Sequence, residues 1–163
     1  MELYLIRHAD AEPIDSPGVR CDAERALTLE GKREFKKVAS GLKKVAGVPN
    51  LILTSPFVRA RQTAEILRDT FGLQSNALQQ DDRLAAGASP QNILYLVNEM
   101  KRDRLVLVGH EPDFSRFISA TTCGHAQGGV AMKKGGVARI DFNGRDTELI
   151  WLLPPKITKV LAE

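Results

Sequence analysis

The residues Leu3-Tyr4-Leu5-Ile6-Arg7-His8 decide the fold of this chain. Four consecutive apolar residues are typical of a buried strand, and an arginine and a histidine follow where the apolar run ends. In open α/β sheets, ligands bind at the carboxyl ends of the strands. The stretch therefore predicts a central strand over residues 2–7 with a binding site at its end.

Length and composition fit a single globular domain over residues 1–163. The chain is 43% hydrophobic and 26% charged, which is enough to form a core without disulfides. Its net charge is only +3 and it has no basic stripe interleaved with aromatic residues, so we expect no nucleic-acid partner. Two isolated cysteines and the lack of a membrane-spanning stretch predict a cytoplasmic protein that does not bind membranes. No apolar stripe is evident, so we expect a monomer.

The rest of the chain alternates between helical and strand patterns. Helices are expected over residues 29–46, 56–71, 90–100 and 112–122, with Thr28, Ser55 and Ser89 as N-caps and Gly72 as a C-cap. Strands are expected over residues 51–53, 76–80 and 105–108, and a closing hairpin over 137–142 and 148–153 around Asn143-Gly144. Residues 9–27 and 124–136 are predicted loops, the first of them long enough for a lid. This alternation predicts a three-layer α/β/α sandwich with a mixed, mainly parallel sheet.

Three strand-to-helix junctions carry residues suited to an anion. The first is Arg7-His8, the second leads into the helix that holds Arg59 and Arg61, and the third is Gly109-His110-Glu111. In a mainly parallel sheet these junctions share one edge, close to a helix N-terminus that favours anions. A guanidinium suits a phosphoryl dianion, and an imidazole can attack phosphorus. The pattern therefore points to phosphoryl chemistry.

Four segments resemble the histidine phosphatase superfamily, in that family's order. They are residues 5–10, the loop element 25–31 with Ala26 in place of the usual proline, the segment 54–64, which matches almost letter for letter, and 108–112. The resemblance implies a phosphoglycerate mutase-like fold. It also implies a covalent mechanism in which His8 attacks phosphorus and water then hydrolyses the phosphohistidine. Arg7, Arg59 and His110 would hold the phosphoryl oxygens.

The resemblance implies no metal and no cofactor, and the three histidines show no metal-ligand spacing. Arg25 either reaches the phosphoryl group or pairs with an acid. Arg61 is expected to face solvent, and His125 in the glycine-rich loop to lie on the surface.

The proton donor is the open question, because an alkoxide leaving group gains much from a positioned acid. The segment 81–87 is apolar at the position where one branch of the family has an acidic residue. Asp81 and Asp82 are possible displaced donors. Glu111 is another candidate, since a different branch has its donor directly after the second histidine; alternatively it caps the following helix.

The missing acid favours a substrate with a phosphorus–nitrogen bond, whose imidazole leaves more easily than an alkoxide. The short chain and the ambiguous acid resemble the SixA-type phosphohistidine phosphatases. We therefore predict a phosphatase acting on phosphohistidine in a protein. Two alternatives are a phosphomonoesterase acting on small phosphorylated metabolites and an inactive module that binds phosphohistidine proteins.

Overall fold

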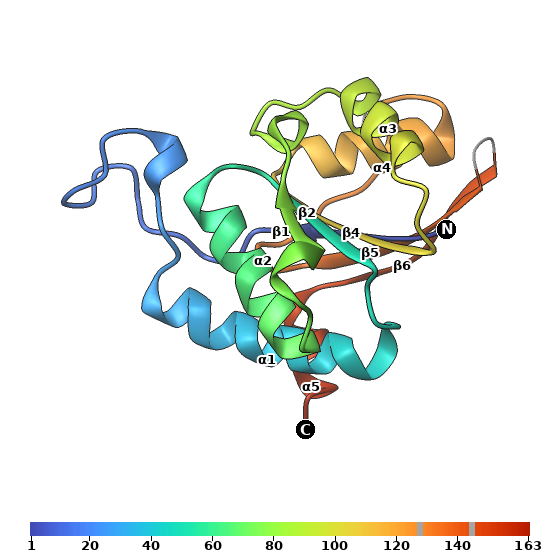
Figure 1. Cartoon of the computed structure of the whole chain (residues 1–163). Helices are drawn as coiled ribbons and strands as arrows, with labels where there is room; N and C mark the ends of the chain where they lie inside the picture. The colour runs from blue at the N-terminus through green and yellow to red at the C-terminus, as the bar shows by residue number, and fades with distance from the viewer. Residues whose placement is uncertain (127–128, 144–145) are drawn as a thin grey trace.

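A computed structural model describes residues 1–126, 129–143 and 146–163, and its centre is a six-stranded sheet in the order β3-β2-β4-β1-β5-β6 (Figure 1). The strands are β1 (Glu2–Arg7), β2 (Leu51–Thr54), β3 (Leu78–Gln80), β4 (Arg104–Gly109), β5 (Val137–Asn143) and β6 (Asp146–Leu153). The first four are parallel, whereas β5 and β6 add an antiparallel edge. The predicted mixed, mainly parallel sheet is confirmed.

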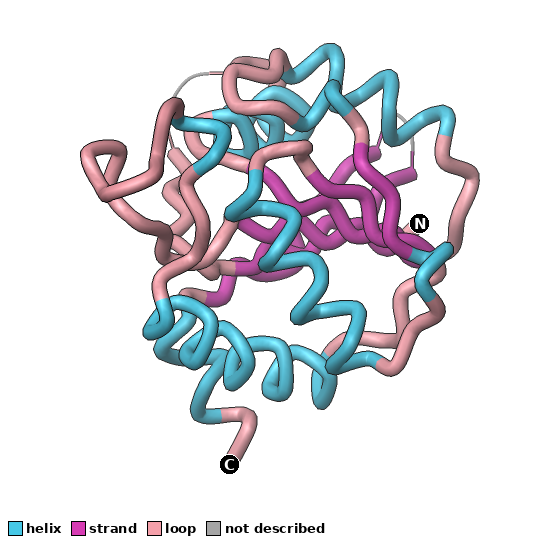
Figure 2. Tube along the Cα trace, turned by 60° about the vertical axis from the view of Figure 1, so that its left-hand side comes forward, coloured by secondary structure: helices cyan, strands magenta, loops and turns pink. Residues whose placement is uncertain are grey.

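Helices cover both faces of this sheet (Figures 1 and 2). On one side lie α1 (Leu29–Val45), α2 (Val58–Phe71) and α5 (Pro155–Val160); on the other lie α3 (Pro90–Glu99) and α4 (Asp113–Cys123). Three short 3-10 turns complete the described elements: η1 (Asp22–Glu24), η2 (Ser75–Ala77) and η3 (Asp82–Leu84). The predicted three-layer α/β/α architecture is therefore confirmed.

The alternation of side chains along β1 explains why the sheet needs two helical layers. Leu3 and Leu5 belong to the core beneath α3 and α4, while Tyr4 and Ile6 belong to the core beneath α1 and α2. All four are at most 1% exposed. A strand buried on both faces reads as a continuous apolar run, as this one does.

Local capping chemistry sets most helix ends as expected. The Thr28 hydroxyl accepts a hydrogen bond from the Gly31 amide at 2.8 Å, and Ser89 accepts one from Asn92 at 3.2 Å. Gly72 ends α2 with a φ of 70°, in the left-handed region that favours glycine. The prediction for Ser55 was wrong: α2 begins at Val58, and Ser55 instead takes part in the site described below.

Two further features were not expected from the sequence. The loop over residues 9–27 contains η1 and a short bridge between Ala11 and Leu27. The helix α5 follows β6 and packs on α1. The two strands of the predicted closing hairpin pair as expected, but Gly144 of its turn lies outside the described residues.

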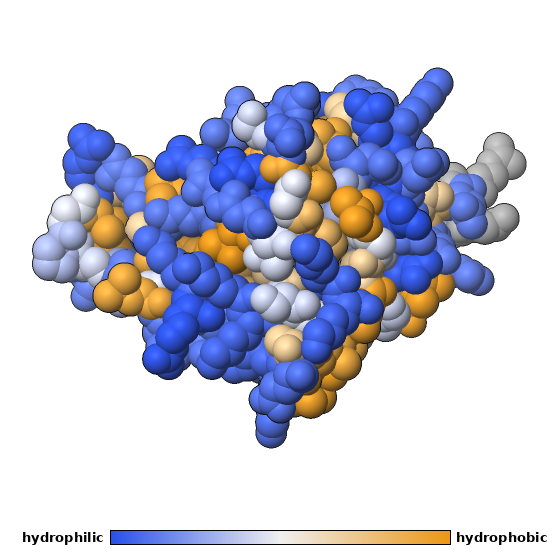
Figure 3. Space-filling model, turned by 60° about the horizontal axis from the view of Figure 1, so that its bottom comes forward, coloured by the Kyte–Doolittle hydropathy of each residue, from blue (hydrophilic) through white to orange (hydrophobic). Residues whose placement is uncertain are grey.

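Figure 3 turns the α1 and α5 side toward the viewer, and its hydrophobic side chains form patches among polar ones. Leu29, Ile157 and Val160 are among the exposed large hydrophobic residues of these two helices or their ends. None of the described helices combines the length and apolar character needed to cross a bilayer.

Candidate active site

The carboxyl ends of β1, β4 and β2 meet at one edge of the sheet and bring the predicted residues together. Arg7 lies beside Gly109 in the parallel register of β1 and β4, and Thr54 lies beside Val108 in that of β2 and β4. The residues that follow these strands are therefore neighbours in space. The ring centroids of His8 and His110, for example, are 5.3 Å apart.

His8 is held with one ring nitrogen available for chemistry. Its Nδ1 lies 2.7 Å from the carbonyl oxygen of Ala9, which can only accept, so Nδ1 carries the hydrogen. Its Nε2 then accepts a hydrogen bond from Arg59 Nε at 3.2 Å. Burial, with Arg59 and Arg7 nearby, lowers the pKa of His8 to about 4, although the hydrogen bond to Ala9 opposes this shift. At neutral pH the ring is therefore uncharged, with its lone pair on Nε2.

His110 is oriented from two sides. Arg59 Nη2 lies 3.4 Å from its Nδ1, and because a guanidinium only donates, Nδ1 is the acceptor. Nε2 then donates to the hydroxyl of Ser55 at 2.8 Å. Burial and the charge of Arg59 lower the pKa of His110 to about 3, so this ring is also neutral at physiological pH. The ring of Phe57 packs edge-on at 5.0 Å.

Arg59 contacts both histidines and Asp22. It lies in the first turn of α2, which points its side chain toward the ends of β1 and β4, and it is only 4% exposed. In addition to the two histidines, its Nη1 and Nη2 donate to the main-chain oxygen and the carboxylate of Asp22 at 2.6 and 2.8 Å. Thr63, one turn along α2, accepts from the amide of Ala9 and so joins this helix to the segment after His8.

Arg7 offers a buried donor to the same region. Its Nη1 donates to the carbonyl of Met132 at 2.7 Å, whereas its Nε is buried and has no hydrogen-bond partner among the described residues. Burial lowers the pKa of Arg7, and the carboxylate of Glu111 works in the opposite direction. The amide of Gly135 donates to the carbonyls of both Arg7 and His8 and so connects the glycine-rich loop to the end of β1.

Arg25 and Glu111 make contacts at the margin of this site. Arg25 donates to the carbonyl of Glu12 at 2.6 Å and pairs with the carboxylate of Asp22 at 2.8 Å. Glu111 accepts from the amide of Ser115 at 3.0 Å, in the first turn of α4. Arg25 thus pairs with an acid, and Glu111 caps α4. For each residue the sequence had offered this contact as the alternative to a direct role at the phosphoryl group.

The other two candidate donors are engaged differently or exposed. Asp81 forms a two-pronged pair with Arg83, and these hydrogen bonds hold the pKa of its carboxyl below the ordinary value despite partial burial. Asp82 is exposed in η3. His125 is exposed as expected, and Arg61, which pairs with Glu65 on α2, is 40% exposed.

Two residues of the site escaped the sequence analysis. Ser55 fits the pattern of a helix cap, and no local signal marks it as the partner of a histidine 55 residues away. Asp22 lies in a polar loop with several other charged residues, and only the three-dimensional path of that loop brings it to Arg59.

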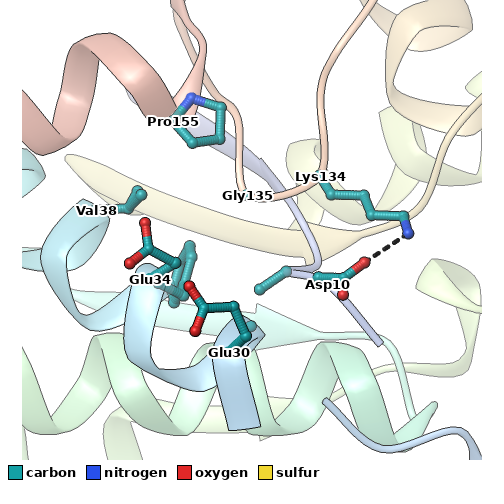
Figure 4. Close-up of a pocket in the computed structure, with 10 residues that line it drawn as sticks. Asp10, Glu30, Glu34, Val38, Lys134, Gly135 and Pro155 are labelled. Atoms are coloured by element: carbon teal, nitrogen blue, oxygen red, sulfur yellow. Dashed lines mark hydrogen bonds and ion pairs between the residues drawn. The ribbon is translucent and has the colours of Figure 1, made fainter. Parts of the chain in front are cut away.

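A separate cavity of about 110 Å³ lies beyond the segment that follows His8 (Figure 4). Ala9, Phe35 and Val38 are among the residues that line it, as are Lys134 and Asp10, which form an ion pair of 2.7 Å. None of the four residues Arg7, His8, Arg59 and His110 lines it. The cavity is therefore a neighbour of the site and not the site itself.

The sequence matches the family model of the histidine phosphatase superfamily, branch 1, over residues 3–86. This chain belongs to that superfamily. An uncharacterized protein of Picosynechococcus sp. is 35% identical over 96% of this chain and 98% of its own length. The phosphohistidine phosphatase SixA of Escherichia coli is 36% identical over 47% of this chain and 45% of its own length.

Solved structures of phosphatases share the fold. The protein histidine phosphatase SixA in complex with tungstate superimposes with a TM-score of 0.83 at 22% identity, covering 96% of this chain and 99% of that one. An alpha-ribazole phosphatase from Shigella flexneri gives a TM-score of 0.70 at 17% identity, covering 95% and 97%. The phosphoglycerate mutase-like fold expected from the sequence is thus confirmed.

Within this histidine phosphatase, the sequence-predicted residues Arg7, His8, Arg59 and His110 form one cluster. Two neutral imidazoles and two guanidiniums meet there, largely removed from water. Among the residues that the structure describes, no group of three histidine, cysteine or acidic side chains is placed to bind a metal ion. The cluster can bind a compact anion and present an imidazole nitrogen to it.

Proposed function

We propose that this protein is a phosphatase that forms a phosphohistidine intermediate on Nε2 of His8 and removes phosphate from phosphohistidine in a protein. The observation that carries the first part is the state of His8: its Nδ1 is bound to Ala9, and its neutral Nε2 faces the Arg59 guanidinium. A neutral imidazole carries on its unprotonated nitrogen the electron pair that attack on phosphorus requires, and Arg59 releases that pair as the phosphoryl group binds.

The arginines support a phosphoryl substrate. Arg7 Nε is a buried donor without a partner among the described residues, and such a donor is costly unless an acceptor reaches it. Phosphoryl transfer is promoted mainly by positioning and by stabilising the charge on the equatorial oxygens. Arg7 and Arg59 would take this role, and Arg25 would stand at the margin. His110 would join them by gaining a proton beside the bound dianion, because its one N–H is donated to Ser55.

The proposed reaction has two steps. Nε2 of His8 forms a bond to phosphorus as the bond from phosphorus to the substrate imidazole breaks, and that imidazole takes up a proton. Water then attacks the phosphorus of phospho-His8, loses a proton, and releases inorganic phosphate and neutral His8.

The placement of the carboxylates supports a substrate with a phosphorus–nitrogen bond. Asp81 is paired with Arg83, Asp82 is exposed, and Glu111 accepts from a helix amide. An imidazole leaving group needs less help from an acid than an alkoxide does. The similarity to SixA points in the same direction.

The test compares a phosphohistidine-bearing protein with p-nitrophenyl phosphate and a panel of sugar and glycerate phosphates. We expect kcat/KM to be highest on the phosphoprotein and His8→Ala to lower it at least about a thousandfold. His125→Ala, which removes an exposed histidine, is the matched control. A higher kcat/KM on the small esters would overturn the proposal that the substrate is a protein. Wild-type enzyme that never carries labelled phosphate on His8 would indicate a binding module instead.

A small phosphorylated metabolite is the second candidate, supported by the likeness to a phosphatase of alpha-ribazole. Glu111→Gln separates the two, because glutamine keeps an oxygen for the Ser115 amide but cannot supply a carboxyl proton. If Glu111 protonates an ester leaving group, activity on the sugar and glycerate phosphates, which leave as alkoxides, falls about a hundredfold or more and activity on phosphohistidine changes little.

A further inference from the structure

Asp22 binds Arg59 in the way an anionic ligand would. Its carboxylate accepts from Nη2 and its main-chain oxygen from Nη1, so both terminal nitrogens of the guanidinium are engaged by one residue. The Arg59 side chain is 5% exposed, whereas that of Asp22 is 48% exposed. The acid therefore reaches a buried cation from the solvent side of the site.

The same carboxylate joins two arginines. One oxygen of Asp22 bonds to Arg59 and the other to Arg25, each at 2.8 Å. Burial favours the neutral form of this acid, but the hydrogen bonds and charges of Arg25 and Arg59 prevail and keep its pKa below the ordinary value. An ionised group between two guanidiniums has the charge and the contacts that a phosphoryl group would have.

Asp22 and a phosphoryl group would compete for Arg59. Arg59 Nε points at His8 Nε2, so the guanidinium lies beside the atom that would attack phosphorus. A phosphoryl group in reach of that atom would take its hydrogen bonds from Nη1 and Nη2, which Asp22 holds. The carboxylate of Asp22 and a phosphoryl group bound by the same guanidinium would also repel one another.

The loop that carries Asp22 is anchored at its base and exposed beyond it. The base of its loop is fixed by the Ala11–Leu27 bridge and by the hydrogen bond from the Leu27 amide to Gln62 on α2. Beyond this base the loop projects from the body of the molecule (Figures 1 and 2). Asp22 itself is exposed and belongs to a single 3-10 turn.

We propose that Asp22 competes with oxyanions for Arg59: it holds this guanidinium until a phosphoryl group, with its greater charge and larger number of acceptor oxygens, displaces it. Every oxyanion that binds here, the product phosphate included, is held less tightly as a result. This proposal rests on the proposed function, because it assumes that the cluster around His8 binds phosphoryl groups.

The test is calorimetric titration of inorganic phosphate and of tungstate into wild type, Asp22→Asn and Asp22→Ala. We expect both variants to bind both oxyanions about fivefold more tightly, the size expected from losing one half-exposed charge pair. Phosphate should also become a stronger product inhibitor. Glu24→Gln is the matched control, since Glu24 belongs to the same turn but pairs with Arg20; its affinities should stay within about twofold of wild type.

Unchanged or weaker oxyanion binding in both Asp22 variants would overturn the proposal, provided that circular dichroism shows them folded. A loss of kcat with oxyanion affinity unchanged would also overturn it, because Asp22 would then act in the chemical step. If wild type binds tungstate and His8 is labelled by substrate but the variants bind no better, only this inference fails. If no form binds an oxyanion and His8 is never labelled, the proposed function fails with it.

Discussion

At the scale of single residues, the hydroxyl of Ser55 determines which nitrogen of His110 can act. It accepts from the amide of Phe57 at 3.2 Å and from His110 Nε2 at 2.8 Å, and it is fully buried. The imidazole is thereby kept in one tautomer and one orientation. Ser55 acts on the site through its contact with His110, so it is a positioning residue.

Ser55→Ala should lower kcat on the preferred substrate about tenfold, because His110 loses the contact that orients it. The free energy of unfolding should fall by about 1–2 kcal/mol, since a buried donor is left without its acceptor. Steady-state kinetics and urea denaturation measure the two effects. Ser40→Ala, on an exposed position of α1, should change neither. An unaltered kcat would show that Arg59 alone suffices to orient His110.

Sequence reasoning located Arg7, His8 and His110 because they lie at or directly after strand ends, and the family resemblance selected Arg59 in the helix that follows β2. It did not predict which side chains these residues contact. The contacts of His110 with Ser55 and of Arg59 with Asp22 join segments 55 and 37 residues apart. No local pattern encodes such a pair, and Ser-Pro before a helix has an equally good explanation as a cap.

At the scale of elements, the approach of α5 to α1 depends on a residue without a side chain. A Cβ on Gly41 would lie 1.9 Å from the carbonyl oxygen of Thr158, which is backbone and cannot give way. Thr158 is fully buried between the two helices. The helix α5 has only six residues, too few for stability in isolation, so its formation depends on this packing. For the same reason the sequence did not reveal it.

Gly41→Ala should therefore separate α5 from α1 and lower the free energy of unfolding by about 2 kcal/mol, even though alanine is the better helix former. Denaturant titration measures the loss, and hydrogen exchange should show faster exchange at residues 155–160. Activity should persist, because the contacts of the site come from other elements. Ser40→Ala, one position away on the solvent side, is the control. A gain in stability would mean that α5 packs elsewhere in solution.

At the scale of the whole molecule, two buried neutral histidines make stability depend on pH. The pKa of His8 is lowered to about 4 and that of His110 to about 3, against an ordinary value of 6.5 in the unfolded chain. Between these values the unfolded chain binds more protons than the folded one. Stability is therefore complete above about pH 6.5 and falls as the pH drops toward 4.

Between pH 7.5 and pH 5 the free energy of unfolding should fall by about 2 kcal/mol for each of the two histidines. Urea denaturation at a series of pH values measures the slope of the free energy of unfolding against pH. His8→Asn should flatten the slope, while the exposed His125→Asn should leave it nearly unchanged. A stability that is flat across this range would indicate that the two rings are solvated.

The overall architecture was predictable because strands and helices alternate and each has a clear period or cap. The order of the strands was not predictable from patterns alone: β1 lies between β4 and β5, which come much later in the chain. The residues of β1 do not indicate which strands pair with it, because apolar side chains on both faces suit any central position in the sheet. The order of the strands therefore came from the structure.

The central place of β1 has a consequence for protein synthesis. Residues 2–7 emerge from the ribosome long before their sheet neighbours, residues 104–109 and 137–141. At about 5–20 residues per second, the run Leu3-Tyr4-Leu5-Ile6 waits for on the order of ten seconds without a strand on either side. The nascent chain thus exposes this apolar run until residues 104–109 have been synthesised, and we expect chaperones that bind extended apolar segments to recognise it.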